Sequence, residues 1–410
     1  MMWGRSFRIA ALALLLAACS TPRVPFTAEE QASARVVGIP DARFWADDGP
    51  EAVRARAQKV ASSEALRTSR SFDVLALSGG ASGGAFGAGL LVGWSDTGTR
   101  PEFTVVSGVS VGALIAPFAF LGPDYDPVLR AVFAEGAAEA LIQLDALRGL
   151  FGSGLFRPEP LRNLIARFVD DRVLASVAAE HARGRRLVVL TTNLDAQRAV
   201  IWNMGAIASS GHPRALELFR SILVASASVP GVLPPVLVDV EAFGRQFAEM
   251  HVDGGVTANV LVVPESFLLS QRRLFPSSFP GRMFIVMNNA IEPDFEMVEN
   301  RTLPVIVRSY STTIKANTAK VLKAAEAFAR RHRFDFKLAY IPADYPAPAA
   351  MQFDTEYMKR LFDYAYRSQT KGAGWKRRLP FRDAPPDGPR PPAYSLVNDA
   401  GPRRFSMNLP

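Results

Sequence analysis

The sequence predicts a three-layer α/β/α sandwich in which helices cover both faces of a mostly parallel central sheet. Short apolar runs, typical of buried strands, alternate along the chain with longer helical segments, and this alternation is the pattern of a parallel sheet. The chain has 410 residues, of which 49% are hydrophobic and 21% charged, so it is long and apolar enough for a large core.

Composition and periodicity place the individual elements. Short apolar stretches predict strands over 72–77, 103–107, 186–192, 199–202, 236–240, 250–253, 283–287 and 337–341. Apolar residues at helical spacing predict helices over 50–67, 85–94, 113–121, 214–227, 312–333 and 354–368. The remainder, from 370 onwards, is rich in Pro, Arg and Gly and is expected to be poorly ordered.

The single cysteine of the chain stands at the end of a signal-like segment. Two arginines precede the apolar run 9–18, which is too short to span a membrane. The run ends in Leu-Ala-Ala-Cys, which resembles the lipobox at which bacterial lipoproteins are cleaved and acylated. We therefore expect a lipid anchor on Cys19, the alternative being an ordinary signal peptide with a chance cysteine. Ser20 favours an outer-membrane position facing the periplasm.

The charge and composition exclude several classes of ligand. A net charge of +8 suits an anionic lipid surface and nucleic acid alike. The sequence has no zinc-finger spacing, aromatic–basic RNA motif or recognition-helix pattern, so no nucleic-acid partner is expected. With one cysteine and no cluster of metal ligands, we expect no cofactor and no dependence on calcium.

A Gly-x-Ser-x-Gly motif marks the first candidate site. Ser110 lies between Gly108 and Gly112, directly after an expected strand and before an apolar helix. This is the setting of a nucleophile elbow, in which a tight turn exposes the hydroxyl at a helix N-terminus. The alternative is a plain Gly–Ser turn.

A glycine-rich loop follows the first expected strand. Glycines allow backbone amides to approach an anion closely, so the loop could hold either a phosphate or an oxyanion. The spacing matches neither the dinucleotide-binding fingerprint nor the P-loop, which favours an oxyanion hole. The candidate residues are Gly79, Gly80, Ala81, Ser82, Gly83 and Gly84.

A carboxylate stands at the end of a later expected strand. Asp253 is followed by Gly254 and Gly255, which leave space for its side chain to reach a neighbouring strand end. Asp253 is therefore a candidate base for Ser110, although a turn is the commoner use of Asp-Gly.

In this order the three motifs resemble the patatin-like phospholipase family, and segments 107–121, 225–232 and 252–259 extend the similarity to roughly 73–345. The resemblance implies a Ser–Asp dyad without histidine and a two-step acyl transfer that cleaves lipid esters. One departure stands out. The family loop is Gly-Gly-Gly-x-[Arg/Lys]-Gly, but this chain has Ala81 at the third glycine and Gly83 at the basic position.

Other features leave alternatives open. His251 would face the same way as Asp253 on a strand, so it either assists the dyad or is structural. His332 lies among arginines and is interpreted as part of a solvated helix face rather than as a triad histidine. The apolar stretch 140–156 would line an acyl-chain pocket, form a lid or simply pack as an ordinary helix and loop.

The sequence thus predicts five parts. They are a lipoprotein signal peptide (1–19), an N-terminal tether and helix (20–70), a catalytic core (73–266), the C-terminal part of the same α/β domain (267–368) and a tail (369–410). The expected function is hydrolysis of a membrane lipid or a lipid-like ester. The rival is a non-catalytic lipid-binding or structural lipoprotein of the same fold. The sequence does not indicate the oligomeric state.

Overall fold

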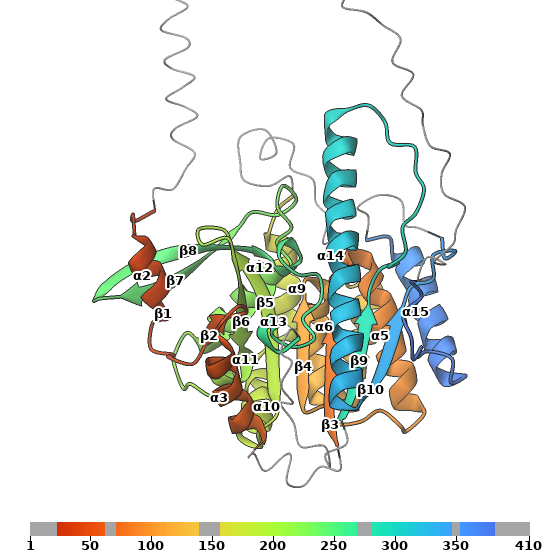
Figure 1. Cartoon of the computed structure of the whole chain (residues 1–410), viewed down its shortest axis with the longest axis horizontal. Helices are drawn as coiled ribbons and strands as arrows, with labels where there is room; N and C mark the ends of the chain where they lie inside the picture. The colour runs from red at the N-terminus through yellow and green to blue at the C-terminus, as the bar shows by residue number, and fades with distance from the viewer. Residues whose placement is uncertain (1–22, 62–70, 139–155, 269–280, 347–352, 382–410) are drawn as a thin grey trace, which may run out of the picture. The chain divides into compact units, whose positions relative to one another are not determined.

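The computed structural model describes residues 23–61, 71–138, 156–268, 281–346 and 353–381. The predicted lipidation residue Cys19, the stretch 139–155 and the tail from 382 onwards lie outside the described residues. Ten strands in the described ranges form one sheet in the order β1-β7-β8-β5-β4-β3-β9-β10, with β6 beside β5 and β2 beside β6 (Figure 1).

The centre of the sheet is parallel. It consists of β5 (Arg186–Asn193), β4 (Val105–Val109), β3 (Phe72–Leu77), β9 (Gly281–Met287) and β10 (Phe334–Tyr340). The strands added antiparallel beyond β5 are β1 (Arg35–Val36), β2 (Arg43–Trp45), β6 (Arg198–Asn203), β7 (Val236–Ala242) and β8 (Arg245–Asp253). The predicted α/β class with a mostly parallel central sheet is confirmed.

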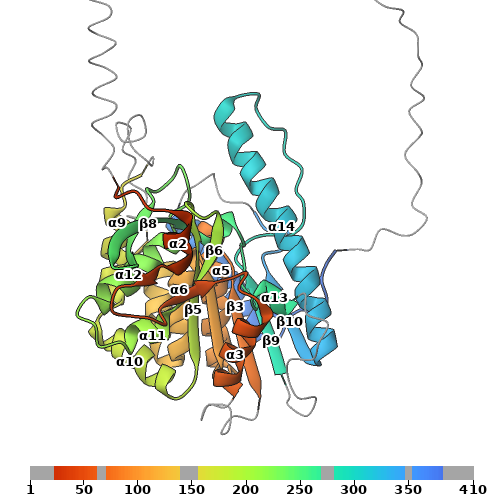
Figure 2. The same ribbon diagram turned by 60° about the vertical axis from the view of Figure 1, so that its left-hand side comes forward.

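Helices cover both faces of the sheet (Figures 1 and 2). One face carries α5 (Gly84–Asp96), α6 (Val111–Leu121), α7 (Asp126–Phe133), α9 (Glu159–Phe168), α10 (Asp171–Ala182), α11 (Met204–Ala208), α12 (Ala215–Ser226) and α15 (Thr355–Thr370). The other face carries α3 (Pro50–Ala61), α13 (Glu265–Leu268) and α14 (Thr302–His332). Every residue of β3 is consequently buried, as expected for a strand covered on both sides.

Two segments differ from the sequence predictions. The stretch expected to be a tether also contains the short helix α2 (Ala28–Ser33), and its strands β1 and β2 pair with β7 and β6. Helix α14 begins ten residues earlier than predicted, and it tolerates Pro304 because the amides of a first helical turn have no acceptor within the helix. No helix among the described residues is long and apolar enough to cross a membrane.

Candidate active site

Ser110 occupies a strained turn between β4 and α6. Its backbone has φ 55° and ψ −125°, a conformation that is uncommon for a residue with a side chain. The turn is possible because its flanking glycines lack side chains. A Cβ on Gly108 would lie 2.5 Å from the carbonyl oxygen of Gly112, and one on Gly112 would collide with the carbonyl oxygen of Leu77. Ser110 therefore caps the N-terminus of α6, where the helix dipole favours negative charge.

Ser226, at the end of α12, holds this turn in place. Its hydroxyl accepts a 3.0 Å hydrogen bond from the Ser110 amide and donates a 2.7 Å bond to the carbonyl oxygen of Leu190 on β5. Ser226 is fully buried. Sequence reasoning placed it in a family-like segment but gave it no role, because its two partners lie on distant strands.

The register of the sheet brings Asp253 to the same place. Strand β4 ends with Val109 paired to Leu190, and β8 ends with Asp253 paired to Thr191, the next residue of β5. Gly254, the next residue, lies directly against β4 and β5. A Cβ on it would lie 2.5 Å from the Leu190 carbonyl oxygen and 3.0 Å from the Val109 side chain. Ser110 thus directly follows the residue that pairs with Leu190, and Asp253 pairs with the next residue of β5. The two residues therefore lie at the same place along that strand.

The Asp253 carboxyl is buried and only partly hydrogen-bonded. Oδ1 accepts a 2.6 Å bond from the Gly255 amide, whereas Oδ2 has no hydrogen-bond partner among the described residues. Burial raises the pKa of Asp253 to about 7, and the Ser110 hydroxyl beside it and the Gly255 amide oppose this shift. A carboxyl with such a pKa can both accept and return a proton near neutral pH.

The glycine-rich loop lies against the Ser110 side chain. A Cβ on Gly79 would lie 3.1 Å from Cβ of Ser110 and 2.5 Å from Oδ1 of Asn259, so a larger residue would force one of these neighbours to move. The Gly79 amide donates to the Asn259 carbonyl oxygen at 2.9 Å, which fixes the loop to the segment after Asp253. The side chain of Asn259, which carried no individual role in the sequence analysis, also lies against Gly79.

Three amides of the loop remain without an acceptor. The Gly83 amide donates to Gly80 at 2.9 Å and the Gly84 amide donates to Ala81, both within the 3₁₀ turn η1 (Ala81–Gly83) and its cap. In the described part of the chain, the amides of Gly80, Ala81 and Ser82 have no hydrogen-bond acceptor, and Ser82 is buried in the turn. Of the six residues predicted for the oxyanion hole, these three are therefore the ones whose amides are not already paired within the protein.

Asn288, directly after β9, shapes this loop. Its side-chain amide donates to the Ser78 carbonyl oxygen at 2.7 Å, and its Oδ1 accepts from the Gly87 amide at 3.1 Å. Its own carbonyl oxygen occupies the positions that side chains on Gly80 and Gly83 would need. A basic side chain at position 83 would therefore collide with this carbonyl oxygen. The sequence had no signal for Asn288, because it comes from a strand far along the chain.

His251 belongs to a buried structural network. Its Nδ1 lies 2.9 Å from Thr191 Oγ1, and its Nε2 lies 3.1 Å from Glu249, which Arg43 also binds. Because the Trp202 indole donates to the same Thr191 hydroxyl, that hydroxyl donates to His251, whose Nε2–H donates to Glu249. Both ring nitrogens are occupied, and burial lowers the pKa of His251. The structural interpretation of this residue therefore fits the geometry.

His332 does not lie on a solvated face, so that prediction was wrong. The residue is only 7% exposed and packs against Phe328, with ring centroids 4.2 Å apart. The surrounding arginines concealed this, because only one side of α14 faces solvent here. The two remaining histidines, His181 and His212, contact Gly205 and Gly38. None of the four histidines of the chain hydrogen-bonds to Ser110 or Asp253 in the described structure.

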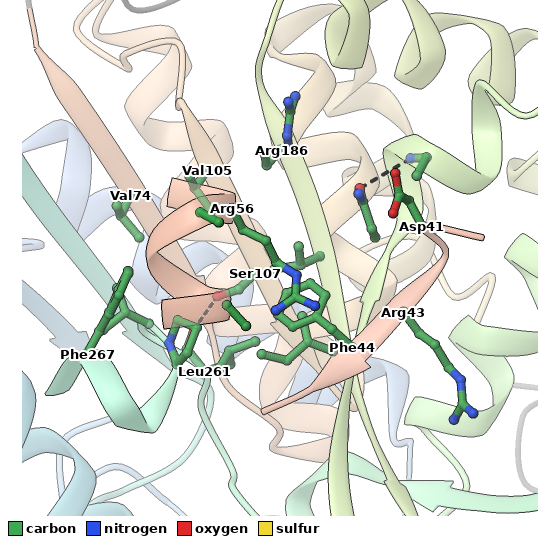
Figure 3. A pocket seen from close by; sticks show the side chains of 18 of the residues that line it. Asp41, Arg43, Phe44, Arg56, Val74, Val105, Ser107, Arg186, Leu261 and Phe267 are labelled. Carbon is green, nitrogen blue, oxygen red and sulfur yellow. Dashed lines mark hydrogen bonds between the residues drawn. The ribbon is translucent and has the colours of Figure 1, made fainter. Parts of the chain in front are cut away.

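A hollow of about 690 Å³ lies elsewhere, between α3 and the sheet (Figure 3). Its walls include Phe44, Arg56, Val105, Ser107 and Leu261, and it is separate from the Ser110 turn. Ser110 and Asp253 are not among the described residues that line it. The described residues also contain no cluster of three or more His, Cys, Asp or Glu side chains that could hold a metal ion.

Comparison with known proteins agrees with the motif order. Residues 75–264, which contain the loop, Ser110 and Asp253, match the family model of the patatin-like phospholipases. Over these residues the chain is similar to a patatin-like phospholipase domain. The domain therefore includes β3 to β8 and the helices between them, and the fold is the patatin fold.

Individual relatives are distant. The uncharacterized protein R571 of Acanthamoeba polyphaga mimivirus is 27% identical over 190 residues, which are 45% of this chain; the chain spans 58% of that protein's length. Among solved structures, VipD from Legionella pneumophila has 12% identity and a TM-score of 0.32, with 74% of this chain and 67% of VipD covered. The type III effector ExoU has 14% identity and a TM-score of 0.19, with 73% and 54% covered. Neither similarity is close enough to place a residue of the site.

Proposed function

We propose that the protein is a lipid acyl hydrolase, of the phospholipase A, lysophospholipase or esterase type, in which Ser110 is the nucleophile and Asp253 the general base. The observation that carries the proposal is the meeting of a strained serine and a buried carboxyl of raised pKa at one point of β5. The patatin-like domain supports an ester of a lipid as substrate.

The geometry supports a two-step reaction. Asp253 accepts the hydroxyl proton as Ser110 attacks the ester carbonyl, and the carbonyl oxygen becomes negatively charged. The free amides of Gly80 and Ala81 and the N-terminus of α6 stabilise that charge. Protonated Asp253 gives its proton to the departing alcohol. Water, deprotonated by Asp253, then hydrolyses the acyl-serine ester and restores both residues.

The proposal includes attachment to the cell envelope. The signal-like segment and the Leu-Ala-Ala-Cys sequence support acylation of Cys19 and an outer-membrane position facing the periplasm. Growth with labelled palmitate should label the wild-type protein and not the Cys19→Ser variant. Equal labelling of both would remove the lipid anchor from the proposal and leave the hydrolase unaffected.

The hydrolase is tested by covalent labelling and by turnover. A fluorophosphonate probe should label the wild-type chain and not Ser110→Ala. A panel of phospholipids, lysophospholipids and simple fatty-acid esters should be hydrolysed by the wild type only. A wild-type protein that neither reacts with the probe nor hydrolyses any member of the panel would instead be a lipid-binding protein of the same fold.

A further inference from the structure

Apolar side chains gather on the surface at one end of α14. Of the ten large apolar residues that are exposed among the described residues, six lie between 295 and 307. Phe295 and Met297 are 97% and 89% exposed, and Ile306 is 57% exposed. The others are Val298, Val305 and Val307. We call residues 293–307, which comprise the loop before α14 and its first turns, the α14 tip.

The side chains of the tip point in several directions. Val305, Ile306 and Val307 are consecutive on a helix, so neighbouring side chains point about 100° apart around its axis. A flat protein surface would cover one side of such a helix and leave the others in water. A fluid apolar medium would surround all three. The arrangement therefore favours immersion in lipid over docking to a rigid protein face.

Ion pairs fasten the loop to the helix. Arg308 binds Asp294 at 3.1 Å and Glu296 at 3.0 Å, and Lys315 binds Asp294. The Lys315 ammonium, together with Arg308, lowers the pKa of Asp294 to about 2, so these pairs persist at neutral pH. The tip is thus a braced structure whose apolar side chains are held outwards.

The tip adjoins the proposed catalytic group. Its loop begins five residues after Asn288, whose carbonyl oxygen lies against the glycine-rich loop beside Ser110. Tyr310 of α14 lies within electrostatic reach of Asp253, whose charge adds to burial in raising the Tyr310 pKa. Thr302 is eight residues before Tyr310, so the helix extends about 12 Å further. Figures 1 and 2 show this end of α14 projecting beyond the neighbouring elements of the sheet.

The tip carries little unbalanced charge. Its three acids are all paired, Asp294 and Glu296 with Arg308, and Glu299 with Arg301 at 3.6 Å. Attraction to an anionic surface therefore contributes little to membrane binding by the tip. The main contribution is burial of apolar area, to the depth of about 5–10 Å that is usual for interfacial segments. The Arg301–Glu299 pair would then lie among the lipid headgroups.

We propose that the α14 tip inserts into the surface of a lipid bilayer and so holds the proposed active site next to its substrate. This proposal rests on the proposed function in one respect only, which is that the substrate is a lipid ester. Insertion itself depends on the apolar side chains and can be measured without any hydrolysis.

The single cysteine of the chain makes a direct test possible. Met297→Cys in a Cys19→Ser background would carry an NBD fluorophore, and the full-length protein would be mixed with phosphatidylcholine vesicles. We expect a blue-shifted, brighter emission and protection from iodide, both of which resist added salt. Phe243→Cys in the same background is the matched control, because Phe243 is 68% exposed in the turn between β7 and β8. Its emission should not change.

Three outcomes would overturn the proposal. The first is a probe at 297 that stays as accessible to iodide as the probe at 243. The second is protection that increases with protein concentration in the absence of vesicles, which would assign the tip to contact between copies. The third is a signal that requires anionic lipid and disappears in salt, which would mean adsorption by charge.

Turnover provides a second measurement. Removing two of the exposed side chains in the double variant Phe295→Ser/Met297→Ser should lower hydrolysis of vesicle phospholipid about ten-fold. Hydrolysis of a soluble short-chain ester should be unchanged. The control Leu237→Ser/Phe243→Ser should change neither rate. Equal loss on both substrates would overturn docking, whereas insertion of the 297 probe by a chain that hydrolyses no ester would reject only the proposed function.

Discussion

Ser110 and Asp253 meet because two strands end against consecutive residues of β5 while approaching from opposite directions. Parallel β4 ends opposite Leu190, and antiparallel β8 ends opposite Thr191. Ser110 therefore follows a parallel strand into a helix, whereas Asp253 arrives on a hairpin strand. A shift of β8 by one residue would turn Asp253 to the other face of the sheet.

The first prediction concerns the pH dependence of hydrolysis. Asp253 must be ionised to accept the Ser110 proton, and burial raises its pKa to about 7. We expect kcat/KM for a soluble ester to rise with pH and to level off above an apparent pKa near 7. The measurement is a pH–rate profile of the wild type with an uncharged substrate. A profile that is already flat at pH 5 would contradict Asp253 as the base.

The same carboxyl should make the fold less stable at high pH. Its pKa is higher in the folded chain than the usual value of 3.8, so between about pH 4 and 7 the folded state binds more protons than the unfolded state. The contribution of Asp253 is then complete at low pH and is lost as the pH rises through the folded pKa. At about 1.4 kcal/mol per pKa unit, the loss by pH 8 is up to about 4 kcal/mol.

Asp253→Asn should therefore abolish hydrolysis and yet raise the free energy of unfolding at pH 8. Asparagine keeps an oxygen that can accept from the Gly255 amide, and it carries no buried charge. Urea titrations of both proteins at pH 5 and pH 8 provide the measurement. The stabilisation should be larger at pH 8, and a variant equally destabilised at both pH values would contradict the assigned pKa.

Ser226 allows a test of how the elbow is positioned. Ser226→Ala leaves the Ser110 amide and the Leu190 carbonyl oxygen unpaired in a buried place, at a cost of about 1–3 kcal/mol in the free energy of unfolding. We expect a lower kcat with little change in KM. The substitution loosens the turn that positions the Ser110 hydroxyl, and it leaves the residues that would bind the substrate unchanged. Ser228→Ala is the control, since Ser228 follows the same helix but its hydroxyl bonds to the Val224 carbonyl oxygen of α12 and not to the Ser110 turn. A kcat as low in Ser228→Ala would assign the effect to the helix end generally.

The sequence predicted what depends on local pattern. Glycine spacing identified the elbow at Ser110 and the loop at 79–84, and the order of the motifs along the chain linked them to one site. Strand pairing between distant segments was beyond such reasoning, and with it the register that positions Asp253. Ser226 and Asn288 were missed for the same reason. Each forms hydrogen bonds with segments that lie far away in the chain.

Burial was harder to predict than secondary structure. His332 lies in an arginine-rich sequence, but one side of the helix at that point packs against Phe328. The start of α14 was placed too late because its first turns carry apolar residues on all sides and so lack an amphipathic stripe. The structure explains why this stripe is missing, since the α14 tip projects into solvent and does not pack against the core.

The last prediction concerns the departure of the loop from the family pattern. Gly83→Lys would restore the basic residue of that pattern, but its Cβ would meet the carbonyl oxygen of Asn288. Because backbone must move to admit it, we expect a loss of about 1–3 kcal/mol in stability. We also expect a lower kcat, since Asn288 shapes the turn that presents the Gly80 and Ala81 amides. Gly49→Lys adds the same charge where a Cβ would meet nothing within 4 Å, and it should alter neither quantity. A Gly83→Lys protein that is as stable as the wild type and more active would show that Asn288 does not fix the loop and that the missing cation had limited the reaction.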